Sequence, residues 1–239
     1  MEIIVENVDW GDASIDNINK LLENVASQLS QYFIKLPINR IRVRYDPNGP
    51  QTLYRNNQNE DFIVILSVHN LYWDQFAYQF SHEFCHILSE FERFKGLSNK
   101  WFQEVICEVA SLFTLKQMAR EWRCSAPYPN WQDYAAVLEE YANNRIDKHK
   151  LRQDKKFNDW FSEKEFILRN DSINRKLNTI IAVNLLPLFQ ENPGEWESIR
   201  YFPDIEENFP IFIKNWIMNV PESHKAFITK IAKNFEISI

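Results

Sequence analysis

The residues best suited to chemistry lie between positions 81 and 86, where the chain reads SHEFCH. This stretch contains the pattern His-Glu-x-x-His and falls in a segment predicted to be helical. His82 and His86 therefore project from one side of a helix, about 6 Å apart along its axis, because each residue rises about 1.5 Å. Two imidazoles placed in this way can reach one zinc ion, and Glu83 lies close enough to polarise a metal-bound water.

A catalytic zinc site needs a third protein ligand and one position that stays open. Glu104 is the candidate for this ligand, because 17 residues separate it from His86. That interval fits the end of one helix, a loop and the start of a second, antiparallel helix. Glu108, one turn later on the same side, is the main competitor for the role. If Glu104 binds the metal, Glu108 can instead accept the N–H of a ligand histidine and hold its orientation.

Three strands and one helix are predicted ahead of the histidine motif, with the strands at residues 2–7, 40–45 and 62–68. The strict alternation in 40–45 predicts a half-buried strand, whose row of arginines is interpreted as the wet face of a sheet rather than as a patch that steers an acidic substrate. The unbroken β-favouring run in 62–68 predicts a strand covered on both faces. A helix with an apolar stripe of period 3.6 begins at Ser14.

The two histidines belong to a helix predicted over residues 72–91. Its apolar stripe, which we expect to face the core, consists of Phe76, Phe80, Phe84, Ile87, Leu88 and Phe91. The histidines fall on roughly the opposite side of the helical wheel, with Gln79 and Glu83 beside them. This helix is therefore predicted to have a core face and a separate polar face that carries the ligands. A second helix is predicted over residues 101–121, after a loop.

The carboxyl-terminal half is predicted to be wholly helical. After a break at residues 125–130, helices are expected near 131–143, 154–169, 173–191, 205–219 and 222–235. The predicted fold class is α+β, with a small mixed sheet and the two metal-binding helices in the amino-terminal half. We expect a core domain at residues 1–125 and a helical region at residues 126–239, and the two halves can also form a single domain.

Composition and charge exclude several classes of function. The net charge is −6, so no overall basic field would attract nucleic acid or anionic lipid. No apolar run approaches the ~20 residues that span a bilayer, so no membrane partner is expected, and the first residues show no signal peptide. Three cysteines cannot form a full disulfide framework. We therefore expect a reducing, cytoplasmic location.

The residues around the motif resemble those of the gluzincin metallopeptidases, which include thermolysin and the aminopeptidase N group. In that family His-Glu-x-x-His is followed, after a slightly longer interval, by a ligand glutamate on a second helix. The ligand often lies in a Trp-x-x-Glu setting, as at residues 101–104 here. A carboxylate four residues after the ligand is also typical of the family, and Glu108 matches it. The resemblance covers roughly residues 60–120.

The resemblance implies a zincin-like fold for the amino-terminal half and a role for each residue of the motif. It implies that His82, His86 and Glu104 bind a zinc ion (Zn2+). It further implies that Glu83 is the catalytic base and that Glu108 forms a hydrogen bond to a metal ligand and holds its orientation. The expected activity is that of a zinc-dependent hydrolase, a metallopeptidase that cleaves a peptide or protein substrate.

Residues 62–68 correspond to the edge strand with which gluzincins hold a peptide substrate. The Gly-x-Met-x-Asn motif of the related aminopeptidases is absent, which argues against aminopeptidase specificity. The alternative function is a zinc-binding regulatory or protein-interaction module without peptidase activity, which would contact a protein partner through the helical carboxyl-terminal half. The intact Glu83 favours the enzyme, because a purely structural site has no use for a base.

Other polar residues leave further possibilities open. Zinc peptidases commonly need a hydrogen-bond donor to the oxyanion. His149, Tyr134 and Tyr141 follow the ligand helices at plausible distances, and the sequence gives no basis for choosing among them. Cys85 and Cys107 are interpreted as small core residues rather than as ligands or nucleophiles.

Overall fold

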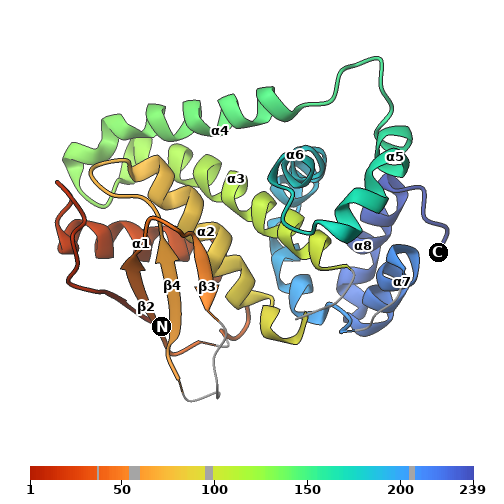
Figure 1. Cartoon of the computed structure of the whole chain (residues 1–239), viewed down its shortest axis with the longest axis horizontal. Helices are drawn as coiled ribbons and strands as arrows, with labels where there is room; N and C mark the ends of the chain where they lie inside the picture. Colours follow the sequence, from red (N-terminus) through yellow and green to blue (C-terminus); the bar gives the residue numbers. More distant parts are fainter. Residues whose placement is uncertain (37, 54–59, 95–98, 205–207) are drawn as a thin grey trace. The chain divides into compact units, whose positions relative to one another are not determined.

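The fold is α+β, with a small mixed sheet and a predominantly helical remainder (Figure 1). The computed structural model describes residues 1–36, 38–53, 60–94, 99–204 and 208–239. Contacts divide the chain into two compact units, one of Met1–Leu88 with Ala110–Arg145 and one of Ser89–Val109 with Ile146–Ile239. Each unit therefore takes residues from both sides of position 125, the boundary predicted from the sequence.

The sheet of the first unit has four strands in the order β1-β2-β4-β3. They are β1 (Glu2–Val5), β2 (Arg40–Tyr45), β4 (Phe62–Leu66) and β3 (Gln51–Leu53). Strands β1, β2 and β4 are parallel, whereas β3 runs antiparallel to β4. The three strands predicted from the sequence are confirmed.

The expectation that residues 62–68 form the edge of the sheet is wrong. Strand β4 (Phe62–Leu66) pairs with β2 on one side and with β3 on the other. Within the part of the chain that the structure describes, the strand at that end of the sheet is instead β3, a strand of three residues that the sequence pattern did not predict. The strongly β-favouring run lies inside the sheet because its side chains are largely buried on both faces, as the unbroken apolar pattern predicted.

Strand β2 shows how alternation in the sequence becomes two different faces. Its apolar Ile41 and Val43 are fully buried, whereas its arginines are exposed or half-buried. Arg40 Nε lies 2.8 Å from Glu2 Oε2, and Arg42 Nε lies 2.7 Å from Asp61 Oδ2. These ion pairs along a solvated face agree with the interpretation of the arginine row as the wet side of the sheet.

Two helices cover the other face of the sheet (Figure 1). Helix α1 (Ile15–Ser30) begins after Ser14, whose hydroxyl caps it by accepting a hydrogen bond from the Asn17 backbone N–H at 3.2 Å. It packs on β1 and on α2 (Trp73–Leu88), and α2 packs on β4 and β3. Helix α2 therefore lies directly behind the end strand.

A long helix, α3 (Lys100–Ser125), contributes residues to both units. Within the first unit, the indole Nε1 of Trp122 donates a hydrogen bond of 2.8 Å to Asn24 Oδ1 of α1. The 3-10 helix η2 (Pro129–Tyr134) and helix α4 (Ala135–His149) follow it. The helix predicted over residues 131–143 is thus two consecutive helices.

The second unit is helical and has an aromatic core. Its elements are η1 (Phe91–Phe94), α5 (Phe157–Asn170), α6 (Arg175–Glu191), η3 (Pro193–Tyr201), α7 (Phe209–Asn219) and α8 (Glu222–Asn234). The ring of Phe209 lies 5.0 Å from that of Phe102 and 4.9 Å from that of Phe235. Within the described ranges, none of the helices combines the length and the apolar character that crossing a membrane requires.

Candidate metal centre

The two histidines of the motif lie on α2, and their rings meet edge to face. The ring centroids of His82 and His86 are 5.0 Å apart, with the ring planes at 73°. His82 is half-buried and His86 is 7% exposed. The prediction that helical spacing places both imidazoles on one side of α2 is confirmed.

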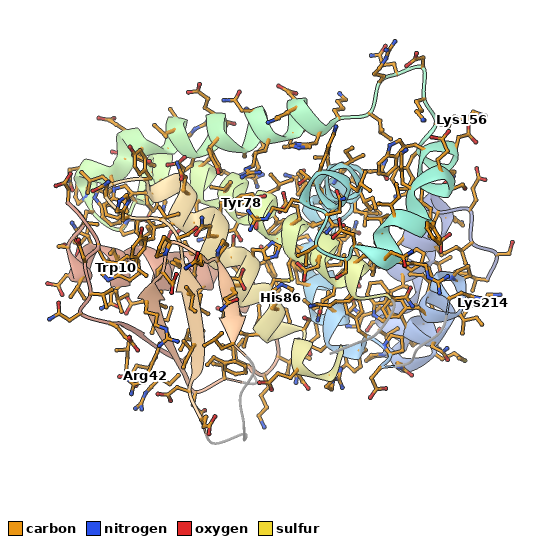
Figure 2. All side chains as sticks on the ribbon, viewed as in Figure 1. Trp10, Arg42, Tyr78, His86, Lys156 and Lys214 are labelled. Atoms are coloured by element: carbon orange, nitrogen blue, oxygen red, sulfur yellow. The ribbon has the colours of Figure 1, made fainter. Side chains whose placement is uncertain are left out.

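Helix α2 has buried side chains on its polar side as well as on its apolar side. The apolar stripe is buried as predicted, with Phe76, Phe80 and Phe84 fully enclosed. On the polar face that carries the histidines, Glu83 is also buried, with only 4% of its surface exposed. Figure 2 marks Tyr78 and His86 on this helix. Burial of a carboxylate requires hydrogen-bond partners to offset the loss of hydration.

Glu83 finds such a partner on the end strand of the sheet. The hydroxyl of Thr52 in β3 lies 2.9 Å from Glu83 Oε2 and 3.2 Å from the backbone carbonyl oxygen of the same residue. Sequence reasoning missed this contact together with β3 itself. The only signal in the sequence was a short β-favouring segment directly after the turn at residues 47–50.

The connection between α2 and the sheet includes a second polar contact. Gln79, four residues before Glu83, accepts a hydrogen bond of 3.0 Å from the Ser67 backbone N–H. Its amide nitrogen lies 3.1 Å from Ser67 Oγ. Two polar side chains of α2 are thus fixed to the strand layer, one at the end of β4 and one at β3.

The carboxylates proposed as further site residues both lie on α3. Glu104 is half-buried, and its role as third ligand stays a prediction. Glu108 is 7% exposed, and its Oε1 lies 2.9 Å from the hydroxyl of Thr179 on α6, within the second unit. The same hydroxyl lies 2.7 Å from the carbonyl oxygen of Arg175. Glu108 is therefore a buried carboxylate held by a distant part of the chain.

One further residue joins the histidines as a potential ligand. Among the described residues, the side chains of His82, His86 and Cys107 offer ligand atoms that all lie within 4.8 Å of one another. Cys107 is fully buried on α3, in keeping with its interpretation as a small core residue. Its thiol is nevertheless a chemically competent zinc ligand, which sequence reasoning had set aside.

Two tyrosines considered as oxyanion donors have other partners in the first unit. Tyr134 donates a hydrogen bond of 2.6 Å to Asp74 Oδ1, and Asp74 precedes His82 by eight residues, or about 12 Å along the helix axis. Tyr141 packs edge-on against Tyr78, with ring centroids 5.7 Å apart. Its hydroxyl accepts a hydrogen bond of 3.2 Å from Arg145.

The third donor candidate, His149, lies at the end of α4 and is half-buried. Comparison with known proteins adds no further assignment. No protein-family model, no curated protein and no solved structure matches this chain.

Proposed function

We propose that this protein is a zinc-dependent peptidase in which His82 and His86 bind the metal and Glu83 is the catalytic base. The observation that carries the proposal is the geometry of α2. Two imidazoles lie 5.0 Å apart on one side of the helix, and between them in sequence is a buried carboxylate with an ordered hydrogen-bond partner. A carboxylate that is buried beside two proposed metal ligands is better placed to transfer a proton than a carboxylate exposed to solvent.

Zinc held by these histidines would lower the pKa of a bound water towards about 7 and polarise the scissile carbonyl. Glu83 supplies the base in this scheme. Its carboxylate takes a proton from the attacking water and passes it to the leaving amine. His82 and His86 serve as ligands through one ring nitrogen each, so neither is needed as an acid or a base.

Glu104 is the proposed third ligand, and Glu108 is proposed to hold a ligand in place. In the first unit, Ser111 Oγ of α3 donates a hydrogen bond of 2.9 Å to the Tyr78 carbonyl oxygen of α2. Glu104 precedes Ser111 by seven residues, close to two full turns, so both project from the same side of α3. This periodicity supports Glu104 as a residue on the side of α3 that turns towards α2.

The proposed substrate is an extended segment of a peptide or protein. Strand β3 (Gln51–Leu53) is the last strand in the order of the sheet, and its Thr52 contacts the proposed base. An extended peptide can add to a sheet through backbone hydrogen bonds with an end strand. Pairing at β3 would place a scissile bond next to Glu83, which supports a peptide over a small-molecule substrate.

The test is to replace Glu83 by Gln and to measure bound zinc and proteolysis together. We expect the variant to retain zinc and to lose cleavage of an unfolded protein such as labelled casein by at least about 100-fold, because the amide cannot accept the proton. Glu23→Gln, on the exposed side of α1, is the matched control and should behave as the wild type. Unchanged cleavage by the Glu83 variant would exclude this residue as the base.

A second function is favoured by one observation, the proximity of Cys107 to the two histidines. If both Cys107 and Glu104 bind the metal, the site has four protein ligands and no position for water, as in structural zinc sites. The protein would then be a zinc-stabilised module that binds a protein partner through its helical carboxyl-terminal half. Zinc retention without proteolysis in the wild type would support this function over the first.

A further inference from the structure

The contact between Thr52 and Glu83 follows from the register of the end strand. In the antiparallel pair of β3 and β4, Thr52 lies opposite Val64, which is fully buried. Side chains directly opposite each other in such a pair project from the same face of the sheet. Thr52 therefore points to the face that α2 covers, where its hydroxyl meets Glu83.

We propose that Thr52 is a positioning residue that fixes the carboxylate of Glu83 for proton transfer. The inference rests on the proposed function of Glu83 as the base. The threonine hydroxyl has one hydrogen to donate. It lies closer to Glu83 Oε2, at 2.9 Å, than to the Glu83 carbonyl oxygen, at 3.2 Å. Because Thr52 holds Oε2, Oε1 is the oxygen that would accept the proton from the attacking water.

The position of Thr52 in the strand gives this contact a second consequence. Thr52 belongs to the same strand that is proposed to pair with the substrate. The backbone that would bind the peptide and the hydroxyl that orients the base are therefore parts of one rigid strand. The substrate would pair with the backbone of β3, whereas the Thr52 hydroxyl contacts only the base. Loss of the hydroxyl should therefore lower kcat more than it raises KM.

The test compares Thr52→Val with Thr52→Ser in the full-length protein. Valine keeps the β-branched shape that favours a strand and removes only the hydroxyl, whereas serine keeps the hydroxyl and gives up the methyl group. If the hydroxyl positions the base, kcat falls in the valine variant and stays close to the wild-type value in the serine variant. If Thr52 contributes only to the packing of the strand, kcat falls in the serine variant and is kept in the valine variant.

We expect Thr52→Val to lower kcat for labelled casein by about 10–100-fold, the range found when an outer partner of a metal-site residue is lost. KM and bound zinc should change little, and Thr52→Ser should keep kcat within about threefold of the wild type. Ser67→Ala is the matched control, since it removes a hydroxyl that joins α2 to the sheet through Gln79, away from the base. This control should keep the wild-type kcat.

A crystal structure of each zinc-loaded variant supplies a readout that does not depend on activity. The Glu83 carboxylate should be rotated in Thr52→Val and should keep its orientation in Thr52→Ser. An unchanged carboxylate and an unchanged kcat in Thr52→Val would overturn the inference. An active Glu83→Gln variant, or a wild type that cleaves nothing, would instead overturn the proposed function, while the orientation of the carboxylate still tests whether Thr52 holds it.

Discussion

Tyr134 donates a hydrogen bond of 2.6 Å to Oδ1 of Asp74, in the first turn of the helix that carries both histidines. Asp74 is 7% exposed. Burial and the hydrogen bond to Asp74 together raise the pKa of Tyr134 above the usual value of about 10. The tyrosine thus connects η2 to the start of α2, at the opposite end of that helix from His86.

Replacing Tyr134 by Phe should destabilise the protein without affecting the metal site. A hydrogen bond to a carboxylate contributes about 1.5–3 kcal/mol, so we expect the free energy of unfolding to fall by about 2 kcal/mol. Bound zinc and kcat should stay at the wild-type level. Tyr128→Phe is the control, because the ring of Tyr128 packs edge-on against Trp131. A loss of kcat at unchanged stability would instead restore Tyr134 as a candidate oxyanion donor.

The same pair should make stability depend on alkaline pH. Folding raises the pKa of Tyr134, so its contribution is fully present below about pH 10 and is lost as the pH rises towards the pKa of the folded state. Above pH 10 the unfolded chain binds fewer protons than the folded chain, which lowers the free energy of unfolding. Urea unfolding should show that the difference in the free energy of unfolding between the wild type and Tyr134→Phe becomes smaller as the pH rises from 8 to 11.

The identity of the third ligand can be decided by two variants on α3. If the site is catalytic, Glu104→Gln should weaken zinc binding by at least about tenfold, whereas Cys107→Ser should retain zinc, because a catalytic site keeps one position open. Cobalt substitution gives an independent check, since a thiolate ligand adds a strong charge-transfer band. Loss of zinc in both variants would indicate a closed, structural site.

The contact between Thr179 and Glu108 should matter for both stability and metal affinity. Thr179→Val removes a buried hydroxyl that lies 2.9 Å from Glu108 Oε1, so we expect a loss of about 1 kcal/mol in the free energy of unfolding. If Glu108 orients a ligand, zinc affinity should fall by about tenfold as well. Calorimetric titration with zinc measures the second effect.

Thr229→Val is the matched control for that variant. The hydroxyl of Thr229 lies 2.8 Å from the carbonyl oxygen of Lys225, four residues earlier, just as the hydroxyl of Thr179 lies 2.7 Å from that of Arg175. Its removal should change stability by less than about 0.5 kcal/mol and leave zinc affinity unchanged. Equal effects of the two substitutions would show that the bond to Glu108 adds nothing beyond the local helix contact.

Zinc removal should lower thermal stability through the two histidines. A ligand present at about 100 times its Kd stabilises the folded state by about 2.7 kcal/mol, which raises Tm by about 5–10 °C for a chain of this size. A chelator should therefore lower Tm by this amount, and restored zinc should reverse the change. His82→Ala should show the low Tm with or without zinc, whereas a chelator effect that persists in this variant would place the metal elsewhere.

Much of the secondary structure could be predicted because its signals are local. The alternation at residues 40–45 gave β2 (Arg40–Tyr45) with the same bounds, and the cap at Ser14 marked the start of α1. Helix α6 (Arg175–Glu191) lies within two residues of its predicted range. Strand β3 escaped prediction because three residues carry too little periodicity to stand out from a turn.

For the candidate site, the sequence by itself determined that His82 and His86 share one side of a helix, since the rise and turn of a helix follow from local backbone hydrogen bonds. The tertiary structure decided which distant groups meet Glu83 and Glu108. Thr52 is 31 residues from Glu83, and Thr179 is 71 residues from Glu108. Contacts over such separations depend on how whole elements pack, and that packing depends on many side chains at once, which no local pattern records.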